Sequence, residues 1–372
     1  MSRMARQTLP HVQVGGRGRA ALERMSMPAR IEDVAATAGV SMKTVSRVFN
    51  NEPNVREKTR LRVEAAAKEL NYRPNPSARG LAGNRSYLIS LVYDDPAAGS
   101  SYIMEIIVGV LAACENSHYS AILRPLEYAN ADHIGSVEDS IARYRPDGLI
   151  LVPPFADDLK LLRRLDALGV RYATISGKAK IWHERIGTIL DERKAAAEMI
   201  AHAVALGHKR IAHIAGPPPH GGRAWRLAGY RDGLLRAGLP YDETLVVEGG
   251  FSFDAGIVGA RQLLDLKSRP TAIFAANDDS ACGVMHEAFE RGMSIPGDLS
   301  VFGFDDTPTS RQIWPSLTTV RQPCRDMGRI AAEQLLALIR DPNAGQLVHV
   351  PYQLQIRQSS GPPPRRSRLH AR

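Results

Sequence analysis

Residues 39–50 read GVSMKTVSRVFN, and the residues before them have the spacing of a short amphipathic helix. Ile31, Val34, Ala35 and Ala38 fall at positions i, i+3, i+4 and i+7, which is one face of a helix. Gly39 follows this face and suits a left-handed residue that ends the helix. The stretch therefore predicts a first helix that turns sharply at residue 39.

A second helix is expected directly after this turn. The hydroxyl of Ser41 can accept a hydrogen bond from the backbone amide of Thr44, and Val45 and Val48 then point inward. Three or four residues between two short helices is the spacing of a helix-turn-helix. A third helix, over roughly residues 57–70, is expected to cover the pair and to bury Leu61, Val63 or Ala66, and Leu70.

A helix-turn-helix places the first turn of its second helix against base edges in the major groove of DNA. Lys43 can donate to guanine, Met42 can contact a thymine methyl group, and Arg47 can reach guanine or a phosphate. Spacing alone leaves another interpretation open, a solvated helical face that carries basic residues. The candidate DNA contacts in this segment are Ser41, Met42, Lys43, Thr44, Ser46, Arg47 and Asn50, with Arg56, Lys58 and Arg73 expected mostly at phosphates.

The run DVAATAGVSMKTVSRVFNNEPNVREKTRLRVEAAAKELNYRPNPSARGL resembles the DNA-binding headpiece of the lactose-repressor (LacI) family. Members of that family show DVA, AGVS, TVSRV and Asn at fixed spacing, then a third helix and YRPN. The resemblance implies that residues 39–50 are the turn and recognition helix of an operator reader. Arg30 departs from the pattern, because the family usually has Thr or Ser ahead of the first helix.

Residues 71–85, NYRPNPSARGLAGNR, contain two prolines and two glycines, a composition typical of a solvated linker. The family resemblance implies instead a hinge helix, formed on operator DNA, at residues 76–81. In that role Leu81 enters the minor groove and Arg79 lies along it. Gly80 stands where the family more often has Ser or Ala, which weakens helix formation by roughly 1 kcal/mol.

From residue 86 onward, short apolar runs alternate with helical stretches. The runs are SYLISLVY, AILRPL, DGLILVPP, RYATIS, RIAHIAG, TLVVEG, PTAIFAAND and LSVFGFDD. This alternation predicts an α/β fold with parallel sheets covered on both faces, and its length favours two lobes. The expected fold is thus an all-α head followed by a two-lobed α/β core.

Ligands of open parallel sheets bind beyond the carboxyl ends of the strands. That rule selects Asp94 and Asp95, Asn277 and Asp278, and Asp305 and Asp306. Capping of the next helix is the alternative interpretation for each, because Asp and Asn are favoured at helix N-termini.

ALGHKRIAHIAGP, RLAGYRDGL, AIFAANDDSACGVMHEAFERGMSIPGDLSVFGFDD and PSLTTVRQP resemble the ligand-binding core of the same family, which is similar to periplasmic sugar-binding proteins. The resemblance implies that Asn277 and Asp305 hold ligand hydroxyls and that Phe251 stacks on a sugar face. One arginine, Arg226 or Arg223, would close over the ligand, and Ala224 stands where the family usually has a pocket Arg. First-lobe candidates are Asp95, Tyr102 and Asp191.

The net charge of +9 is unevenly distributed. Residues 1–27 carry +4, residues 30–85 carry +5 and the last twelve residues carry +4, whereas residues 86–360 carry −4. A polyanion is therefore expected to bind near the ends of the chain and not to its middle.

Several other classes of protein lack support in the sequence. No apolar run approaches the roughly 20 residues that cross a bilayer, and the N-terminus lacks the apolar segment of an export signal, so a cytoplasmic location is expected. No G-x-S-x-G, P-loop or H-E-x-x-H motif points to an enzyme. His208 and His213 are interpreted as structural, and Cys114, Cys282 and Cys324 lack the spacing of a metal site or a disulfide framework.

These observations predict a homodimeric DNA-binding transcriptional regulator with no cofactor or metal, a repressor by resemblance. A sugar is favoured as effector, with a purine or other ligand, an α/β enzyme and an unregulated sugar-binding protein as alternatives. The C-terminal residues show no leucine heptads for a tetramer. The expected parts are a disordered basic extension (1–27), the head (28–74), the hinge (75–85), the two-lobed core (86–358) and a basic flexible tail (359–372).

Overall fold

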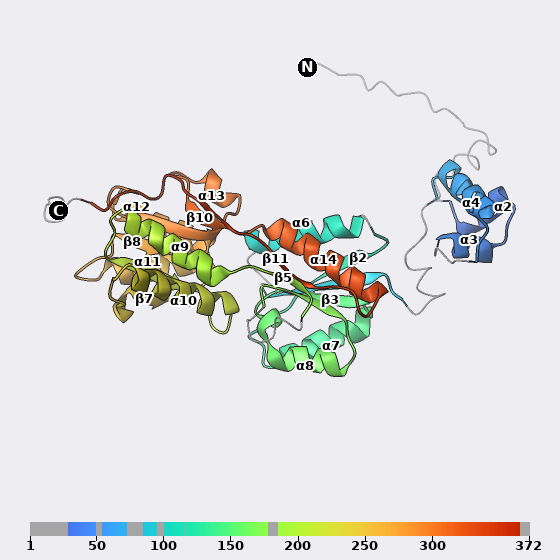
Figure 1. Ribbon diagram of the computed structural model, residues 1–372, viewed down its shortest axis with the longest axis horizontal. Coiled ribbons are helices and arrows are strands. Elements are labelled where there is room, and N and C mark those ends of the chain that lie inside the picture. Colours follow the sequence, from blue (N-terminus) through green and yellow to red (C-terminus); the bar gives the residue numbers. More distant parts are fainter. Residues whose placement is uncertain are drawn as a thin grey trace, which may run out of the picture. The chain divides into compact units, whose positions relative to one another are not determined.

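The computed structural model describes residues 29–49, 54–72, 85–94, 100–115, 117–177 and 185–364. The chain divides between Arg85 and Ser86 into two units, which we call the head and the core (Figure 1). Within the described ranges, none of the helices has the length and apolar character needed to span a membrane.

The head consists of three helices, α2 (Ile31–Ala38), α3 (Met42–Phe49) and α4 (Glu57–Glu69). Gly39 ends α2 in the left-handed conformation, with φ 61°. The hydroxyl of Ser41 accepts a hydrogen bond from the Thr44 amide at 3.1 Å, which confirms the predicted cap of α3. The helices meet in a small apolar core that consists of Val34, Ala35, Ala38, Val45, Val48, Val63, Ala66 and Ala67.

The prediction that Leu61 is buried is wrong, because its side chain is 57% exposed. Val63 and Ala66 form the buried face of α4. Leu61 lies two residues before Val63, a rotation of about 200° around the helix, and therefore faces away from α2 and α3.

The first lobe of the core is a parallel six-stranded sheet in the order β11-β5-β4-β3-β1-β2. Its strands are β1 (Leu88–Tyr93), β2 (Ser120–Pro125), β3 (Gly148–Leu151), β4 (Tyr172–Ile175), β5 (Gly187–Ile189) and β11 (Leu347–His349). Its helices are α6 (Ser101–Glu115), α7 (His133–Tyr144), α8 (Leu159–Ala167) and α14 (Cys324–Arg340), with the short 3-10 helix η1 (Phe155–Asp157) after β3. Figure 1 shows α6 and α14 on one side of the sheet and α7 and α8 on the other.

The second lobe is a six-stranded sheet in the order β12-β10-β9-β8-β6-β7. Its strands are β6 (Ile211–Ala215), β7 (Val246–Glu248), β8 (Ala272–Phe274), β9 (Ser300–Asp305), β10 (Thr318–Arg321) and β12 (Gln353–Gln355), and only β12 pairs antiparallel. Helices α9 (Glu192–Ala205) and α10 (Gly221–Arg236) pack together, as do α11 (Phe253–Leu264) and α12 (Asp278–Glu290). The short helices α13 (Thr309–Gln312) and η3 (Glu243–Leu245) complete the lobe.

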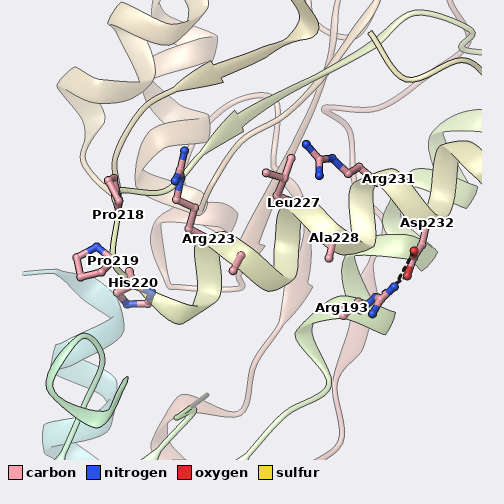
Figure 2. Close-up of a pocket in the computed structure, with 10 residues that line it drawn as sticks. Arg193, Pro218, Pro219, His220, Arg223, Leu227, Ala228, Arg231 and Asp232 are labelled. Atoms are coloured by element: carbon pink, nitrogen blue, oxygen red, sulfur yellow. Dashed lines mark hydrogen bonds and ion pairs between the residues drawn. The ribbon is translucent and has the colours of Figure 1, made fainter. Parts of the chain in front are cut away.

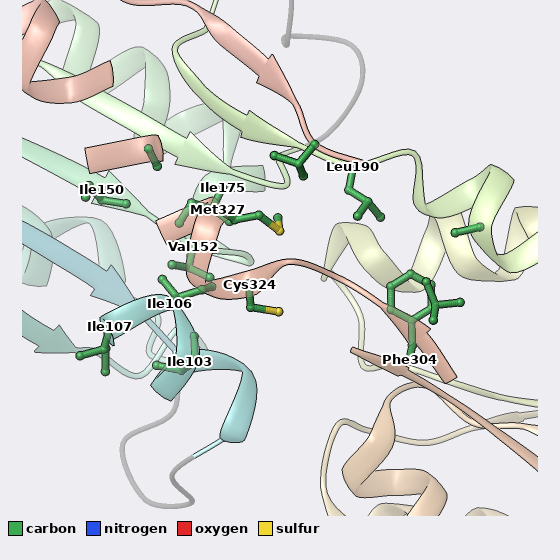
Figure 3. Close-up of a cluster of buried hydrophobic side chains, with 14 of the residues drawn as sticks. Ile103, Ile106, Ile107, Ile150, Val152, Ile175, Leu190, Phe304, Cys324 and Met327 are labelled. Carbon is green, nitrogen blue, oxygen red and sulfur yellow. The ribbon is translucent and has the colours of Figure 1, made fainter. Parts of the chain in front are cut away.

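The chain passes between the two lobes three times, after β5, after β10 and after β11. One apolar cluster includes residues of both lobes and of these crossings (Figure 3). Ile106 and Met327 belong to the first lobe, Leu190 and Cys324 lie at crossings, and Phe304 belongs to the second lobe. The crossings are therefore fixed by packing and not only by chain connectivity.

The C-terminal boundary differs from the prediction of a flexible tail that begins at residue 359. Ser359 is fully buried, and its hydroxyl donates to the backbone oxygen of Val301 at 2.6 Å. The backbone oxygen of Gly361 lies 2.9 Å from Nε2 of His208. These buried polar contacts make the chain part of the second lobe up to at least residue 361. Residues 1–27 and 365–372, predicted to be flexible, lie outside the described ranges.

Candidate functional site

The first turn of α3 lies on the surface of the head. Val45 and Val48 are at most 2% exposed, and their burial fixes the rotation of the helix. Met42 is 51% exposed as a result, and Lys43 and Arg47 are also exposed. A packed helix with basic and polar residues on its outer first turn has the form of a major-groove reader.

Other predicted DNA contacts surround this turn. Ser41, Arg56 and Lys58 are exposed, whereas Thr44 and Ser46 are half-buried. Thr44 and Ser41 also share a hydrogen bond of 2.9 Å between their hydroxyls, so the first turn of α3 is held in place by its own side chains. Four predicted contacts, Asn50, Arg73, Arg79 and Leu81, lie outside the described residues, as does the predicted hinge helix.

A cleft of about 920 Å³ lies between the two lobes of the core. It is lined from the first lobe by residues that include Asp94, Tyr102, Tyr128, Pro154 and Ser176, and from the second lobe by residues that include Glu192, Arg226, Phe251, Asn277 and Asp305. Tyr102, Arg226, Phe251, Asn277 and Asp305 were candidates from the sequence, so the fold brings five of the eight candidate ligand residues together. This is the site expected at the carboxyl ends of parallel strands.

Asn277 is buried, caps a helix and also lines this cleft. It caps α12, because its side-chain oxygen accepts from the Ser280 amide at 2.9 Å. Its Nδ2 donates to the backbone oxygen of Phe251 at 3.0 Å, which ties the aromatic residue to the capped helix. Since an amide nitrogen has two protons, one donor of Asn277 remains for a ligand.

Asp305 ends β9 and is 4% exposed. Its Oδ1 accepts a hydrogen bond from Nε2 of Gln322 at 2.6 Å. Burial raises the pKa of this carboxyl group, although the nearby Arg226 acts in the opposite direction. Ligand hydroxyl groups that donate to Asp305 would relieve the cost of keeping a charged carboxylate away from water.

Arg226 lies on α10 and is the arginine that reaches the cleft. Its Nε donates to Glu192 at 2.7 Å, and another nitrogen lies 3.9 Å from Asp305. Its guanidinium group stacks 3.8 Å from the ring centre of Phe304. Burial alone would lower the pKa of Arg226, but the two carboxylates outweigh it and raise the pKa.

Two non-glycine residues with left-handed φ angles lie at this cleft, one in each lobe. Ser176 follows β4 with φ 51°, and Asp305 has φ 122°. The hydroxyl of Ser176 is buried without a hydrogen-bond partner in the described part of the chain. Strained backbone and an unsatisfied polar atom are features that concentrate at binding sites.

Aromatic side chains provide the apolar surface of the cleft. Phe251 packs edge-to-face against His220 at 4.6 Å between ring centres. Tyr102, at the start of α6, has a pKa raised well above the usual value, first by burial and then by nearby groups that include Glu192 and Asp305. Its hydroxyl is therefore a neutral donor beside carboxylate acceptors.

Three predicted ligand residues do not reach the cleft as the structure describes it. Asp191 is exposed and caps α9, with its carboxylate accepting from the Lys194 amide at 2.9 Å. Arg223 lies instead in a separate hollow of about 560 Å³ along α10 (Figure 2). It pairs with Glu248. Asp95 lies outside the described residues.

The two remaining strand-end acids have structural contacts. Asp278 is fully buried and accepts hydrogen bonds from Thr307 and Thr319. Asp306 pairs with Arg357 and accepts from the Ser310 hydroxyl at 3.0 Å.

Sequence reasoning missed Glu192, Tyr128 and Ser176. Ser176 stands at the end of the predicted run RYATIS, so the strand-end rule could have included it. Glu192 gave no such signal, because its burial depends on Arg226, which is 34 residues away.

Comparisons with known proteins found matches to both the head and the core. Residues 30–75 match the model of bacterial regulatory proteins of the lacI family, and residues 200–360 match that of the periplasmic binding protein-like domain. Catabolite control protein A of Priestia megaterium is 31% identical over 90% of this chain and 100% of its own length. The lac repressor dimer bound to operator and the anti-inducer ONPF aligns with a TM-score of 0.73 at 31% identity, over 90% of this chain and 100% of that one. The CelR–cellobiose complex aligns with a TM-score of 0.69 at 30% identity, over 89% and 100%.

A helix-turn-helix head joined to a two-lobed receptor core defines a class of DNA-binding transcriptional regulators. The chain belongs to the lacI family of bacterial regulatory proteins. It is therefore a DNA-binding regulator, as predicted, and not an α/β enzyme.

Proposed function

We propose that this chain is a cytoplasmic repressor that binds a pseudo-palindromic operator as a homodimer and responds to a sugar bound in the cleft. The observation that carries the effector assignment is the presence in one cleft of an aromatic face, Phe251, and of two buried polar groups, Asn277 and Asp305. A sugar ring offers an apolar face and a rim of hydroxyl groups that match these two kinds of surface.

One solved relative supports a sugar, since CelR forms a complex with cellobiose. A purine is the second candidate, because Phe251 and Tyr128 both line the cleft and can stack on a base. A purine would also need donors and acceptors that match its edge.

Control of DNA binding follows from the position of the cleft between two lobes. A ligand that contacts Tyr102 on one lobe and Asp305 on the other favours the closed arrangement of the lobes. Helices α6 and α14 pack together in the first lobe, and we expect the exposed side of α6 to meet a second copy of the chain. Closure of the lobes would then change the surface that the first lobe presents to that copy. The proposed hinge segments of the dimer then separate, and operator affinity falls.

Selection of bound sequences from random duplexes tests the DNA half of the proposal and is expected to yield two related half-sites. Gel-shift titrations on that sequence, with a panel of neutral sugars and with hypoxanthine and guanine, test the effector half. We expect one sugar to lower operator affinity. A panel in which no compound alters affinity would contradict the effector assignment, and a purine response would replace the sugar with the second candidate.

A further inference from the structure

Among the residues that the structure describes, those lining the cleft carry more negative than positive charge. Five of them have carboxylate groups, and Arg226 is the single guanidinium. The carboxylates are Asp94, Glu192, Asp254, Asp279 and Asp305. An anionic ligand would therefore meet repulsion unless it could pair with Arg226.

Arg226 is already engaged on several sides. Its Nε donates to Glu192 at 2.7 Å, and its Nη1 donates to the backbone oxygen of Ala276 at 2.5 Å. Its Nη2 lies 3.9 Å from Asp305, and its plane covers the ring of Phe304. These hydrogen bonds use two of the five guanidinium N–H groups, but the positive charge already faces Glu192 and Asp305, so an incoming anion would compete with two carboxylates for it.

Glu192 is the partner that holds this arrangement. Glu192 is 2% exposed and lines the cleft at the first position of α9. A buried carboxylate that loses its cation is strongly destabilised, so Glu192 and Arg226 are expected to stay paired when a ligand binds.

We infer that Glu192 determines the charge class of the effector: the cleft accepts an uncharged polyol or one that carries an amino group, and it rejects uronates and sugar phosphates. This inference rests on the proposed effector function of the cleft. Glu192 acts through Arg226, because it pairs with the single guanidinium among the described lining residues, the group that an acidic sugar would need.

The buried acid at the end of β9 supports the same assignment. Burial raises the pKa of Asp305, so this carboxyl group gains from hydroxyl donors or from a cationic amine. An anion placed beside it would raise the pKa further and lose binding energy. Tyr102 lies close to the same acids and remains protonated, so it offers a donor but no positive charge.

The test uses matched ligands and matched variants of the full-length chain. The panel contains glucose, glucosamine, glucuronate and glucose 6-phosphate, with the corresponding galactose and mannose series, and binding is measured by calorimetry at pH 7.5. Glu192→Gln removes the charge but keeps an acceptor for Arg226. Glu290→Gln removes one charge at an exposed position of α12 and serves as the control.

For the wild-type chain we expect neutral or amino members to bind and their acidic counterparts to bind at least about tenfold more weakly. Glu192→Gln is expected to gain roughly tenfold in affinity for the uronate of the best series, with Glu290→Gln unchanged. Tighter binding of an acidic member to the wild-type chain overturns the inference while it supports a small-molecule regulator. Equal behaviour of the two variants overturns the role of Glu192. A panel in which nothing binds overturns the inference about the effector, and the operator selection then still tests DNA binding separately.

Discussion

Lys43 and Lys58 have the same charge but different positions in the head. Lys43 is on the exposed first turn of α3, and Lys58 is at the start of α4. Because base edges specify and phosphates position, Lys43→Ala is expected to relax base preference at one site, with a loss of about 1–3 kcal/mol on the preferred base. Lys58→Ala is expected to weaken all sequences alike and to reduce the salt dependence by about one ion.

Fluorescence anisotropy on the selected operator and on its single-base variants, at several salt concentrations, separates these two effects. Equal, sequence-independent losses in both variants would contradict the assigned roles of Lys43 and Lys58.

His213 is a buried histidine whose ionisation opposes folding. It lies in β6 between the rings of Tyr230 and Phe274, and its Nδ1 is 2.9 Å from the Phe274 oxygen. Burial lowers its pKa to about 4, below the 6.5 of a free histidine. The unfolded chain therefore binds the proton first as pH falls, and His213 reduces stability by up to about 3 kcal/mol between pH 6.5 and 4.

His213→Phe is expected to flatten this acid loss of stability, as measured by urea unfolding at pH 7.5, 6, 5 and 4.5. The exposed His349→Asn variant should follow the wild-type curve. Asp278 and Asp305 have raised pKa values, so they change the stability in the opposite direction as pH falls. Both acids are present in wild type and in His213→Phe, so the difference between the two curves isolates His213. Parallel curves for wild type and His213→Phe would contradict the prediction.

Single residues differ in how far the sequence predicts them. Asn277 and Asp305 could be predicted from the local sequence. Each follows an apolar run that predicts a strand, and the carboxyl ends of parallel strands face the ligand site. The local sequence could not decide whether Arg226 or Arg223 reaches the cleft. Both lie on α10, and only the helix rotation, with Arg226 buried and Arg223 in the outer hollow, separates them.

At the scale of elements, η1 of the first lobe meets the N-terminus of α10 in the second lobe. The Gly221 amide donates to Oδ2 of Asp157 at 2.6 Å, and both residues are buried. A carboxylate at a helix N-terminus is favoured by the helix dipole and by this charge-assisted hydrogen bond. Asp157 therefore stabilises the observed arrangement of the two lobes.

Asp157→Asn is expected to shift the lobes toward a more open arrangement by about 1.5–3 kcal/mol, because it removes the charge from this contact. Spin labels at the exposed positions Arg163 and Arg236, with Cys282 replaced by Ser, report the distance between lobes. Asp139→Asn, an exposed change on α7, is the control. An unchanged distance distribution in Asp157→Asn would exclude this role.

The long elements were predictable and several short ones were not. Residues 88–93, for example, form β1 within the predicted run SYLISLVY, because a buried strand needs a continuous apolar sequence. Strands β5, β11 and β12 have three residues each and form through pairing with distant segments. Strands β7 and β8 are as short, but the predicted runs TLVVEG and PTAIFAAND contain them, whereas none of the predicted runs contains β5, β11 or β12.

At the scale of the whole molecule, the distribution of charge separates DNA binding, expected toward the basic ends, from ligand binding in the core. The basic residues concentrate toward the ends, whereas residues 86–360 carry −4. The second crossing returns the chain to the first lobe through α14 and the third leads it to β12, so both lobes contain residues from distant parts of the sequence. The sequence predicted two lobes from its length, but the crossings depend on pairings that only the folded structure reveals.

One exposed apolar face of the core is expected to form the dimer. Met104, Val108 and Leu111 lie one turn apart on α6 and are 53%, 39% and 43% exposed. The opposite face of the same helix packs on α14 through Ile106 and Gly109. An apolar stripe of this kind on a helix typically indicates a protein interface, and a homodimer requires a self-complementary one.

Leu111→Glu is expected to convert the dimer to monomers at micromolar concentration, because two added charges would meet across the symmetric interface. Operator affinity should fall about a hundredfold, since each head then binds its half-site alone. Leu235→Glu changes an even more exposed leucine, at 78%, on α10 and should leave both properties unchanged. Sedimentation velocity gives the mass and a gel shift gives the affinity. A dimer that persists in Leu111→Glu, with wild-type operator binding, would place the interface on another surface.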